Sequence, residues 1–195
     1  DYFDLAKLKK IIYELKPDVI VNCAAYTDVD GCETNHKLAS DLNTVFVENL
    51  TSICRVIDAH LITFSTDYIF DGKKGPYDEE AYPNPLNYYG KTKHSAENAC
   101  RVGLDKFTII RTNVVFGVSS YNKPNFISWL IDKFQEDKEF NVITGQYCNP
   151  TITDDIAQAV LKIILKQRFG VYNVAGTTIM NRFEISQRVA KVFGF

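Results

Sequence analysis

Two segments decide the fold: residues 61–66, with the sequence LITFST, and residues 88–93, with the sequence YYGKTK. The apolar start of the first predicts a short buried strand that ends at Ser65 and Thr66. Open α/β sheets bind ligands at the carboxyl ends of their strands, so we expect both hydroxyls to face a crevice. Residues 88–100 contain no proline, and they follow a Pro-Asn-Pro segment that cannot continue a helix. They therefore predict a helix.

That helix places Tyr89 and Lys93 at positions i and i+4, on one face. A neighbouring ammonium favours the phenolate, so we expect Lys93 to lower the pKa of Tyr89 from its usual value of about 10. Tyr89 would then act as a general acid or base, while Thr66 or Ser65 hydrogen-bonds a substrate carbonyl. The spacing alone is a weak signal in a chain with 11 tyrosines, because an ordinary tyrosine at a helix start fits it equally.

Apolar runs predict two further buried strands, at 18–22 and 107–112. Residues 4–15 and 38–57 carry apolar side chains at helical spacing, and the second range predicts one long amphipathic helix. Strands and helices alternate, which favours right-handed crossovers and a parallel sheet. The predicted fold class is therefore α/β, a Rossmann-type doubly wound parallel sheet.

The pattern changes beyond Gly117, where 118–125 is a polar loop. We predict a Rossmann-type domain at 1–117 and a mixed region at 118–195, which includes substrate-binding elements and a late sheet strand. Within the mixed region we expect helices from Phe126 and from Asp154, a strand at 170–176 and a last helix at 183–193.

Composition argues against several classes of protein. The net charge of −2 gives no basic field for nucleic acid, and no apolar run approaches the ~18 residues of a membrane-spanning helix. The five cysteines lack Cys-x-x-Cys spacing and the three histidines are scattered, so we expect neither a disulfide framework nor a metal site. A reducing cytoplasm is the expected location.

Three motifs together carry a resemblance. The segments 65–72 (STDYIFDG), 84–93 (NPLNYYGKTK) and 111–113 (RTN) resemble the extended short-chain dehydrogenase/reductases, and within them the dTDP-4-dehydrorhamnose reductase family. The resemblance runs from Asp1 to about Phe195. It implies a reductase that transfers hydride from NADPH or NADH to a nucleotide-linked 4-keto-6-deoxy sugar while Tyr89 protonates the oxygen. A homodimer is possible, and neither nucleic acid nor membrane is an expected partner.

The resemblance also implies roles for individual residues. Catalysis is implied for Thr66, Tyr89 and Lys93. Substrate contacts are implied for Thr66, Asp67, Tyr68, Tyr89 and Asn113. Cofactor contacts are implied for Asp1, Ala24, Ala25, Tyr26, Asn43, Ser65, Tyr89, Lys93, Asn113 and Val115, with Asn43 as a supporting residue. From the residues alone, Ala24 and Ala25 fit an alanine-packed turn equally well, Asn43 an ordinary polar helix position, and Asn113 a strand cap.

Two features depart from the family pattern. The glycine-rich turn that holds a pyrophosphate is not encoded in this chain, so we expect the chain to be a piece of a longer protein whose first βα units precede it. Val114 stands where the reductases usually carry an aromatic residue, and Asn113 where they carry serine. Two alternatives therefore stay open: a nucleotide-sugar epimerase or dehydratase, and a non-catalytic relative such as the regulatory subunit of methionine adenosyltransferase.

Overall fold

The computed structural model describes residues 4–118, 125–136 and 138–195. The chain forms two compact units, which interleave along the sequence. Unit 1 comprises Asp1–Arg111 and Lys162–Asn173, and unit 2 comprises Thr112–Leu161 and Val174–Phe195. Each unit is described by itself below.

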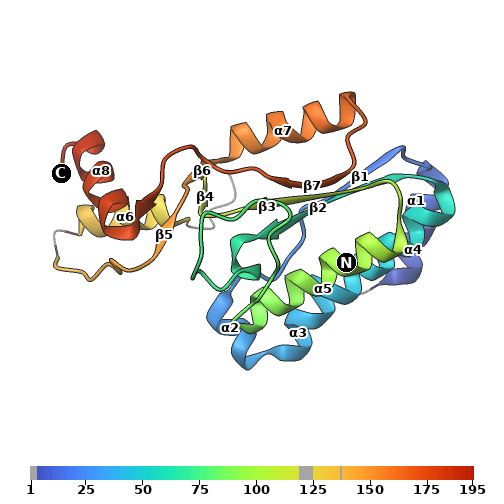
Figure 1. Cartoon of the computed structure of the whole chain (residues 1–195), viewed down its shortest axis with the longest axis horizontal. Coiled ribbons are helices and arrows are strands. Elements are labelled where there is room, and N and C mark those ends of the chain that lie inside the picture. Colours follow the sequence, from blue (N-terminus) through green and yellow to red (C-terminus); the bar gives the residue numbers. More distant parts are fainter. Residues whose placement is uncertain (1–3, 119–124, 137) are drawn as a thin grey trace. The chain divides into compact units, whose positions relative to one another are not determined.

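Unit 1 is built on a four-stranded sheet with the order β1-β2-β3-β7 (Figure 1). The strands are β1 (Val19–Asn22), β2 (His60–Thr66), β3 (Phe107–Thr112) and β7 (Gly170–Asn173). β1 pairs with β2 and β3 with β7, both in parallel. The predicted parallel sheet of a Rossmann-type α/β fold is confirmed, and the late strand predicted at 170–176 is the shorter β7.

The helices of unit 1 begin with α1 (Leu5–Leu15), which Asp4 caps by accepting a hydrogen bond from the Lys7 backbone N–H. The long helix predicted at 38–57 forms a continuous helical run but not a uniform one. Its pieces are α3 (His36–Ser40), the π-helical turn η1 (Asp41–Val45) and α4 (Phe46–Ile57). Two elements were not predicted, the short helix α2 (Val29–Thr34) and the 3₁₀ turn η2 (Asp67–Ile69). The helix predicted from residue 88 is α5 (Tyr88–Gly103).

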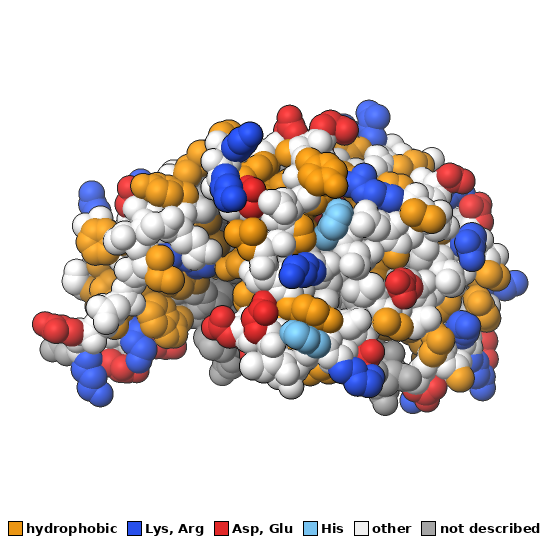
Figure 2. Space-filling model, turned by 60° about the horizontal axis from the view of Figure 1, so that its bottom comes forward, with side chains coloured by type: hydrophobic (Ala, Val, Ile, Leu, Met, Phe, Trp, Pro, Cys, Tyr) orange, Lys and Arg blue, Asp and Glu red, His pale blue; other side chains and the backbone are white. Residues whose placement is uncertain are grey.

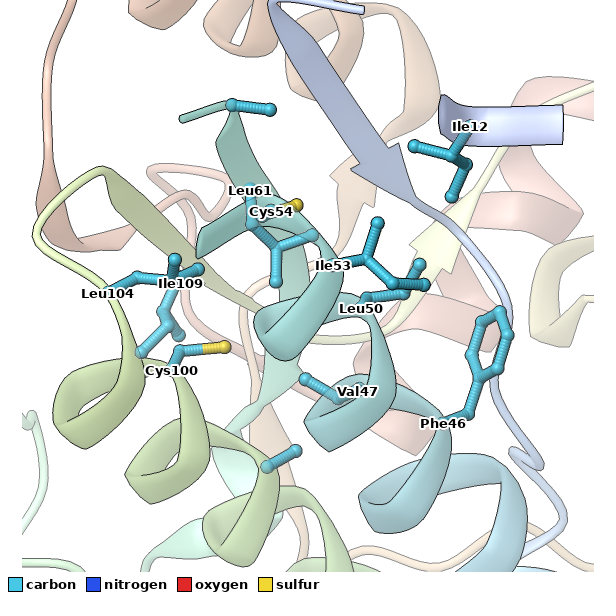
Figure 3. Close-up of a cluster of buried hydrophobic side chains, with 12 residues drawn as sticks. Ile12, Phe46, Val47, Leu50, Ile53, Cys54, Leu61, Cys100, Leu104 and Ile109 are labelled. Carbon is cyan, nitrogen blue, oxygen red and sulfur yellow. The ribbon is translucent and has the colours of Figure 1, made fainter. Parts of the chain in front are cut away.

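α4 and α5 lie side by side against one face of the sheet (Figure 1). Their apolar faces meet the strands in one core, which Figure 3 shows from the helix side. Burying this apolar surface is the main force that holds helices and sheet together. The core consists of Ile12, Phe46, Val47, Leu50, Ile53, Cys54, Ala59, Leu61, Ala96, Cys100, Leu104 and Ile109.

Unit 2 contains two small sheets and a helix pair. β4 (Val115–Phe116) pairs in parallel with β6 (Thr151–Ile152), and β5 (Tyr147–Cys148) pairs antiparallel with β8 (Met180–Asn181). α6 (Phe126–Gln135) and α8 (Arg182–Phe193) each begin with a capping box, at Asn125 and Asn181. α7 (Thr153–Leu165) begins in unit 2 and ends in unit 1.

The surface carries charges of both signs. Figure 2 shows Lys and Arg side chains interspersed with Asp and Glu on one face, in keeping with the net charge of −2. Among the described helices, none is long and apolar enough to cross a membrane.

Candidate active site

The candidate site begins where β2 ends. Thr66, the last residue of β2, caps the turn η2 because its Oγ1 accepts a hydrogen bond from the Tyr68 backbone N–H at 3.2 Å. The same hydroxyl donates to the Asp67 carboxylate at 3.1 Å. These bonds hold the Thr66 side chain in one place at the carboxyl end of the sheet.

The start of α5 packs directly on this turn. Asn87 caps the helix by accepting a hydrogen bond from the Gly90 backbone N–H at 2.7 Å. A Cβ atom on Gly90 would lie 2.2 Å from the Tyr68 carbonyl oxygen, so only glycine permits this approach. The close packing brings Tyr89 beside Tyr68, with ring centroids 5.8 Å apart in an edge-to-face arrangement.

Tyr89 is buried, and its phenol lies close enough to the Thr66 hydroxyl for that group to affect its pKa. Burial raises the pKa of the phenol to about 12, although the Thr66 hydroxyl lowers it and the Asp67 charge raises it further. The expectation that Lys93 lowers this pKa is therefore wrong for the ligand-free chain. The spacing does place Tyr89 and Lys93 on one helix face. Burial of the phenol, however, raises its pKa by more than the Lys93 amine could lower it. The phenol consequently keeps its proton at neutral pH and is suited to donate it.

Lys93 lies on the same helix face, with only 4% of its surface exposed. Burial lowers the pKa of its amine to about 8, while the Glu97 carboxylate opposes this effect. A lysine amine with this pKa is still mostly charged at neutral pH. It is charged at a position that is almost closed to solvent.

Asn43 connects the π-helical turn to the loop after β1. Its Oδ1 accepts from the Tyr26 backbone N–H at 2.8 Å, and its Nδ2 donates to the Tyr26 carbonyl at 3.0 Å and to Thr92 Oγ1 at 3.1 Å. Thr92 in turn donates to the Tyr89 carbonyl at 2.8 Å. The π-turn puts Asn43 in the interior, fully buried, so the alternative of an ordinary polar helix position is wrong.

The ends of β1 and β2 carry the other predicted cofactor residues of unit 1. After β1, the Ala24 backbone N–H donates to Asn22 Oδ1 at 3.0 Å, and Ala24 and Ala25 are both half-buried. Ser65, next to the end of β2, is buried, and its Oγ makes no well-formed hydrogen bond among the described residues, although it lies close enough to the Glu97 carboxylate to lower the pKa of that group. A buried hydroxyl without a partner is costly unless a ligand or water satisfies it.

Asn113 and Val115 belong to unit 2. The Asn113 Oδ1 accepts a hydrogen bond from the Asn149 backbone N–H at 3.2 Å, and Val115 is the first residue of β4. Between them, Val114 has a φ of 37°, a left-handed conformation that a β-branched residue rarely adopts. Such strain is found mostly at functional positions. Asp1, predicted to contact the cofactor, lies outside the described residues.

Three buried polar residues in and around this site were missed by the sequence analysis: Thr92, Glu97 and Arg111. The sequence does contain a signal for Arg111 and Glu97. Arg111 interrupts an otherwise apolar strand, and Glu97 lies four residues after Lys93 on the helix face that carries Ala96 and Cys100. A charge at a buried position requires a partner, and these two are each other's partners. Among the described residues, no group of three or more His, Cys, Asp or Glu could hold a metal ion.

A Rossmann-type sheet, a hydroxyl at the end of β2 and a buried Tyr and Lys one helical turn apart are the features of an extended short-chain dehydrogenase/reductase. The model of the family described as RmlD substrate binding domain matches residues 1–195, and the chain belongs to this family.

The similar proteins include relatives of two kinds. The chain is 35% identical to methionine adenosyltransferase 2 subunit beta of Xenopus laevis, over 97% of this chain and 59% of that protein. It is 30% identical to a dTDP-4-keto-6-deoxy-D-glucose reductase of Streptomyces niveus, over 100% of this chain and 67% of that protein. The chain thus spans a little under two thirds of the length of the first relative.

Solved structures agree with this fold. A dTDP-4-dehydrorhamnose reductase from Clostridium acetobutylicum superposes with a TM-score of 0.94 at 32% identity, covering 100% of this chain and 68% of that one. A dTDP-4-dehydrorhamnose reductase from Bacillus anthracis, solved in complex with NADP, also has a TM-score of 0.94, at 29% identity, covering 100% of this chain and 69% of that one.

Proposed function

We propose that the protein containing this chain is an NADPH- or NADH-dependent reductase of a nucleotide-linked 4-keto-6-deoxy sugar. The observation that carries the proposal is the buried Tyr89, close to the Thr66 hydroxyl, with the buried amine of Lys93 one helical turn away. Relatives named as reductases of such sugars, one of them solved with NADP, support it.

The residues at the ends of β1 and β2 fit a nicotinamide dinucleotide. The small side chains of Ala24 and Ala25 allow a ligand to approach the backbone closely, and the Ser65 hydroxyl is buried without a well-formed hydrogen bond among the described residues. Lys93 offers donors for ribose hydroxyls. When bound, the reduced nicotinamide supplies the hydride that a ketone needs.

The chain's own residues handle the proton. The pKa of Tyr89, raised by burial to about 12, keeps the phenol protonated, so it can give its proton to the oxygen that forms at the carbonyl carbon. The Thr66 hydroxyl orients the carbonyl oxygen toward that phenol once it gives up its hydrogen bond to Asp67 and donates to the substrate. Asp67 and Tyr68, half-buried in the adjoining turn, are proposed to contact the sugar. Asn113 in unit 2 stays a predicted contact.

The proposal is tested with the full-length protein, NADPH or NADH, and a panel of dTDP-4-keto-6-deoxy sugars. Nicotinamide oxidation in equal amount to reduced sugar is the expected result. An epimerase or dehydratase would instead turn over nucleotide sugar without consuming added nicotinamide. A solved dTDP-glucose 4,6-dehydratase and a solved UDP-glucose 4-epimerase that are similar to this chain are 20% and 19% identical to it, so they support the fold alone.

A second candidate rests on the 35% identity to a subunit of methionine adenosyltransferase. In that case the protein would bind a transferase and reduce no sugar. Val114, in place of the family's usual aromatic residue and with a φ of 37°, fits a site that has changed its ligand. Stoichiometric complex formation with a methionine adenosyltransferase, together with absent nicotinamide oxidation across the sugar panel, would favour this candidate over the reductase.

A further inference from the structure

Glu97 and Arg111 form a buried ion pair next to the candidate site. The Arg111 Nε donates to Glu97 Oε1 at 2.9 Å and its Nη2 to Oε2 at 2.8 Å, and the two side chains are 3% and 1% exposed. Arg111 is held further by a hydrogen bond from Nη1 to the Glu79 carbonyl at 3.0 Å and by the Phe70 ring, whose centroid is 5.3 Å away. The guanidinium is therefore fixed, and it fixes the carboxylate in turn.

Glu97 and Lys93 share the buried face of α5, one turn apart. The Glu97 carboxylate raises the pKa of Lys93, against the larger lowering effect of burial. A carboxylate free to move would pair with the amine directly and occupy its donors. Because Arg111 binds both Glu97 oxygens, the carboxylate attracts the Lys93 amine only from a distance.

We propose that Glu97, held by Arg111, is a positioning residue that keeps Lys93 charged in the protein interior while leaving the amine available to a ligand. The inference deepens the proposed function, in which Lys93 holds the dinucleotide. Glu97 thus supplies the negative charge that favours the charged amine. Arg111 keeps the Glu97 carboxylate from pairing directly with that amine.

The other group that raises the pKa of Lys93 is Cys100, and its effect is smaller than that of Glu97. Cys100, on the same helix, and Cys54, which α4 contributes, are thiols whose pKa values burial raises to about 11 and about 12, so both are neutral near pH 8. Arg101 contacts Glu97 at 3.5 Å from the rim of the pair. Asp67, in the turn η2, acts on the phenol of Tyr89.

The test measures the charge of Lys93 directly, in the full-length ligand-free protein labelled with lysine carrying ¹³C at Cε. NMR follows the Lys93 signal, assigned with Lys93→Met, from pH 6 to 11. Glu97→Gln should move its titration midpoint down by about one pH unit, because the anion is lost while Arg111 remains. Arg111→Met should move it up by about one unit, because the carboxylate is then uncompensated. The double variant Glu97→Met/Arg111→Met, which leaves no unpaired buried charge, should lie between them.

Midpoints that do not move in folded single variants, or that move in the same direction, would overturn the inference. If Glu97→Gln fails to fold because Arg111 is left unpaired, the other three midpoints still test the inference. The midpoint of Arg111→Met should lie above those of the parent and of the double variant. The readout is independent of turnover. If the two midpoints shift in opposite directions but no sugar is reduced, this inference stands and the proposed function is refuted. If sugar is reduced but the midpoints do not move, the proposed function stands and this inference is refuted.

Discussion

Replacing Lys93 by methionine should stabilise the ligand-free protein. Lys93 is charged in an interior that solvates it poorly, and its pKa falls from 10.5 to about 8 as a result. At about 1.4 kcal/mol per pKa unit, holding the charged form in the folded state costs about 3 kcal/mol at pH 7. Methionine fills similar space without the charge. We therefore expect Lys93→Met to raise the free energy of unfolding by roughly this amount.

The gain should depend on pH with a definite sign. Between about pH 8 and pH 10.5 the amine loses its proton in the folded parent but keeps it in the unfolded chain. The unfolded state then binds more protons, so the contribution of Lys93 to the parent's stability improves as the pH rises. The advantage of the variant is thus complete below pH 8 and shrinks above it. Most other titrating groups are common to both proteins and cancel in the difference; Cys100 is the exception, because the Lys93 charge lowers the pKa of its thiol.

Urea unfolding of the full-length ligand-free protein and its variants, at pH 7 and pH 10, measures this difference. Lys91→Met is the matched control, because Lys91 is exposed on the same helix and its replacement should change stability by less than about 0.5 kcal/mol. The reasoning fails if Lys93→Met is no more stable than the parent at pH 7, or if its advantage grows with pH.

Two further substitutions test the packing around the site. Asn43→Ala removes three hydrogen bonds, leaves the Tyr26 N–H unpaired and leaves the Tyr26 carbonyl with only a weak bond from the Cys32 thiol, so urea unfolding should show a loss of about 2–4 kcal/mol. The exposed Asn98→Ala is its control, and an equal, small effect of both would contradict the bracing role of Asn43. Gly90→Ala places a Cβ 2.2 Å from the Tyr68 carbonyl oxygen, so the start of α5 must shift. We expect kcat to fall about tenfold or more, since small displacements of catalytic groups are costly. Gly145→Ala, with no atom within 4 Å, should leave kcat unchanged, and parental activity in both variants would show that the close approach is unimportant.

The sheet and the larger helices were predictable because their signals are local. The buried strand at 107–112 is a short apolar run, and the helix from Tyr88 has a proline-rich boundary before it. The π-turn at Asp41–Val45 was not predictable in this way. Its changed hydrogen-bond pattern is stabilised by contacts of Asn43 with residues 17 and 49 positions away. Helical periodicity carries no information about such contacts.

The placement of Tyr89 and Lys93 was predictable, but the electrostatics of the candidate site were not. Spacing alone put Tyr89 and Lys93 on one helix face, which the structure confirms. It could not show that burial raises the pKa of the phenol and lowers that of the amine, because the exclusion of water depends on the packed fold. Arg111 interrupts an apolar strand, which indicates that its charge needs a partner. Which acid would serve was decided by the packing of α5 on the sheet.

The most direct test of the proposed function is the turnover of Tyr89→Phe in the full-length protein, with excess NADPH and the best keto-sugar substrate. Removal of the phenolic proton donor should lower kcat by about 10²–10⁴-fold and leave dinucleotide affinity nearly unchanged. Tyr88→Phe is the control, because the Tyr88 ring stacks on His36 at 3.9 Å and belongs to no proposed catalytic contact. A collapse of kcat at Tyr89 alone is the predicted result, and equal activity of parent and both variants would contradict the assignment of Tyr89 as the general acid.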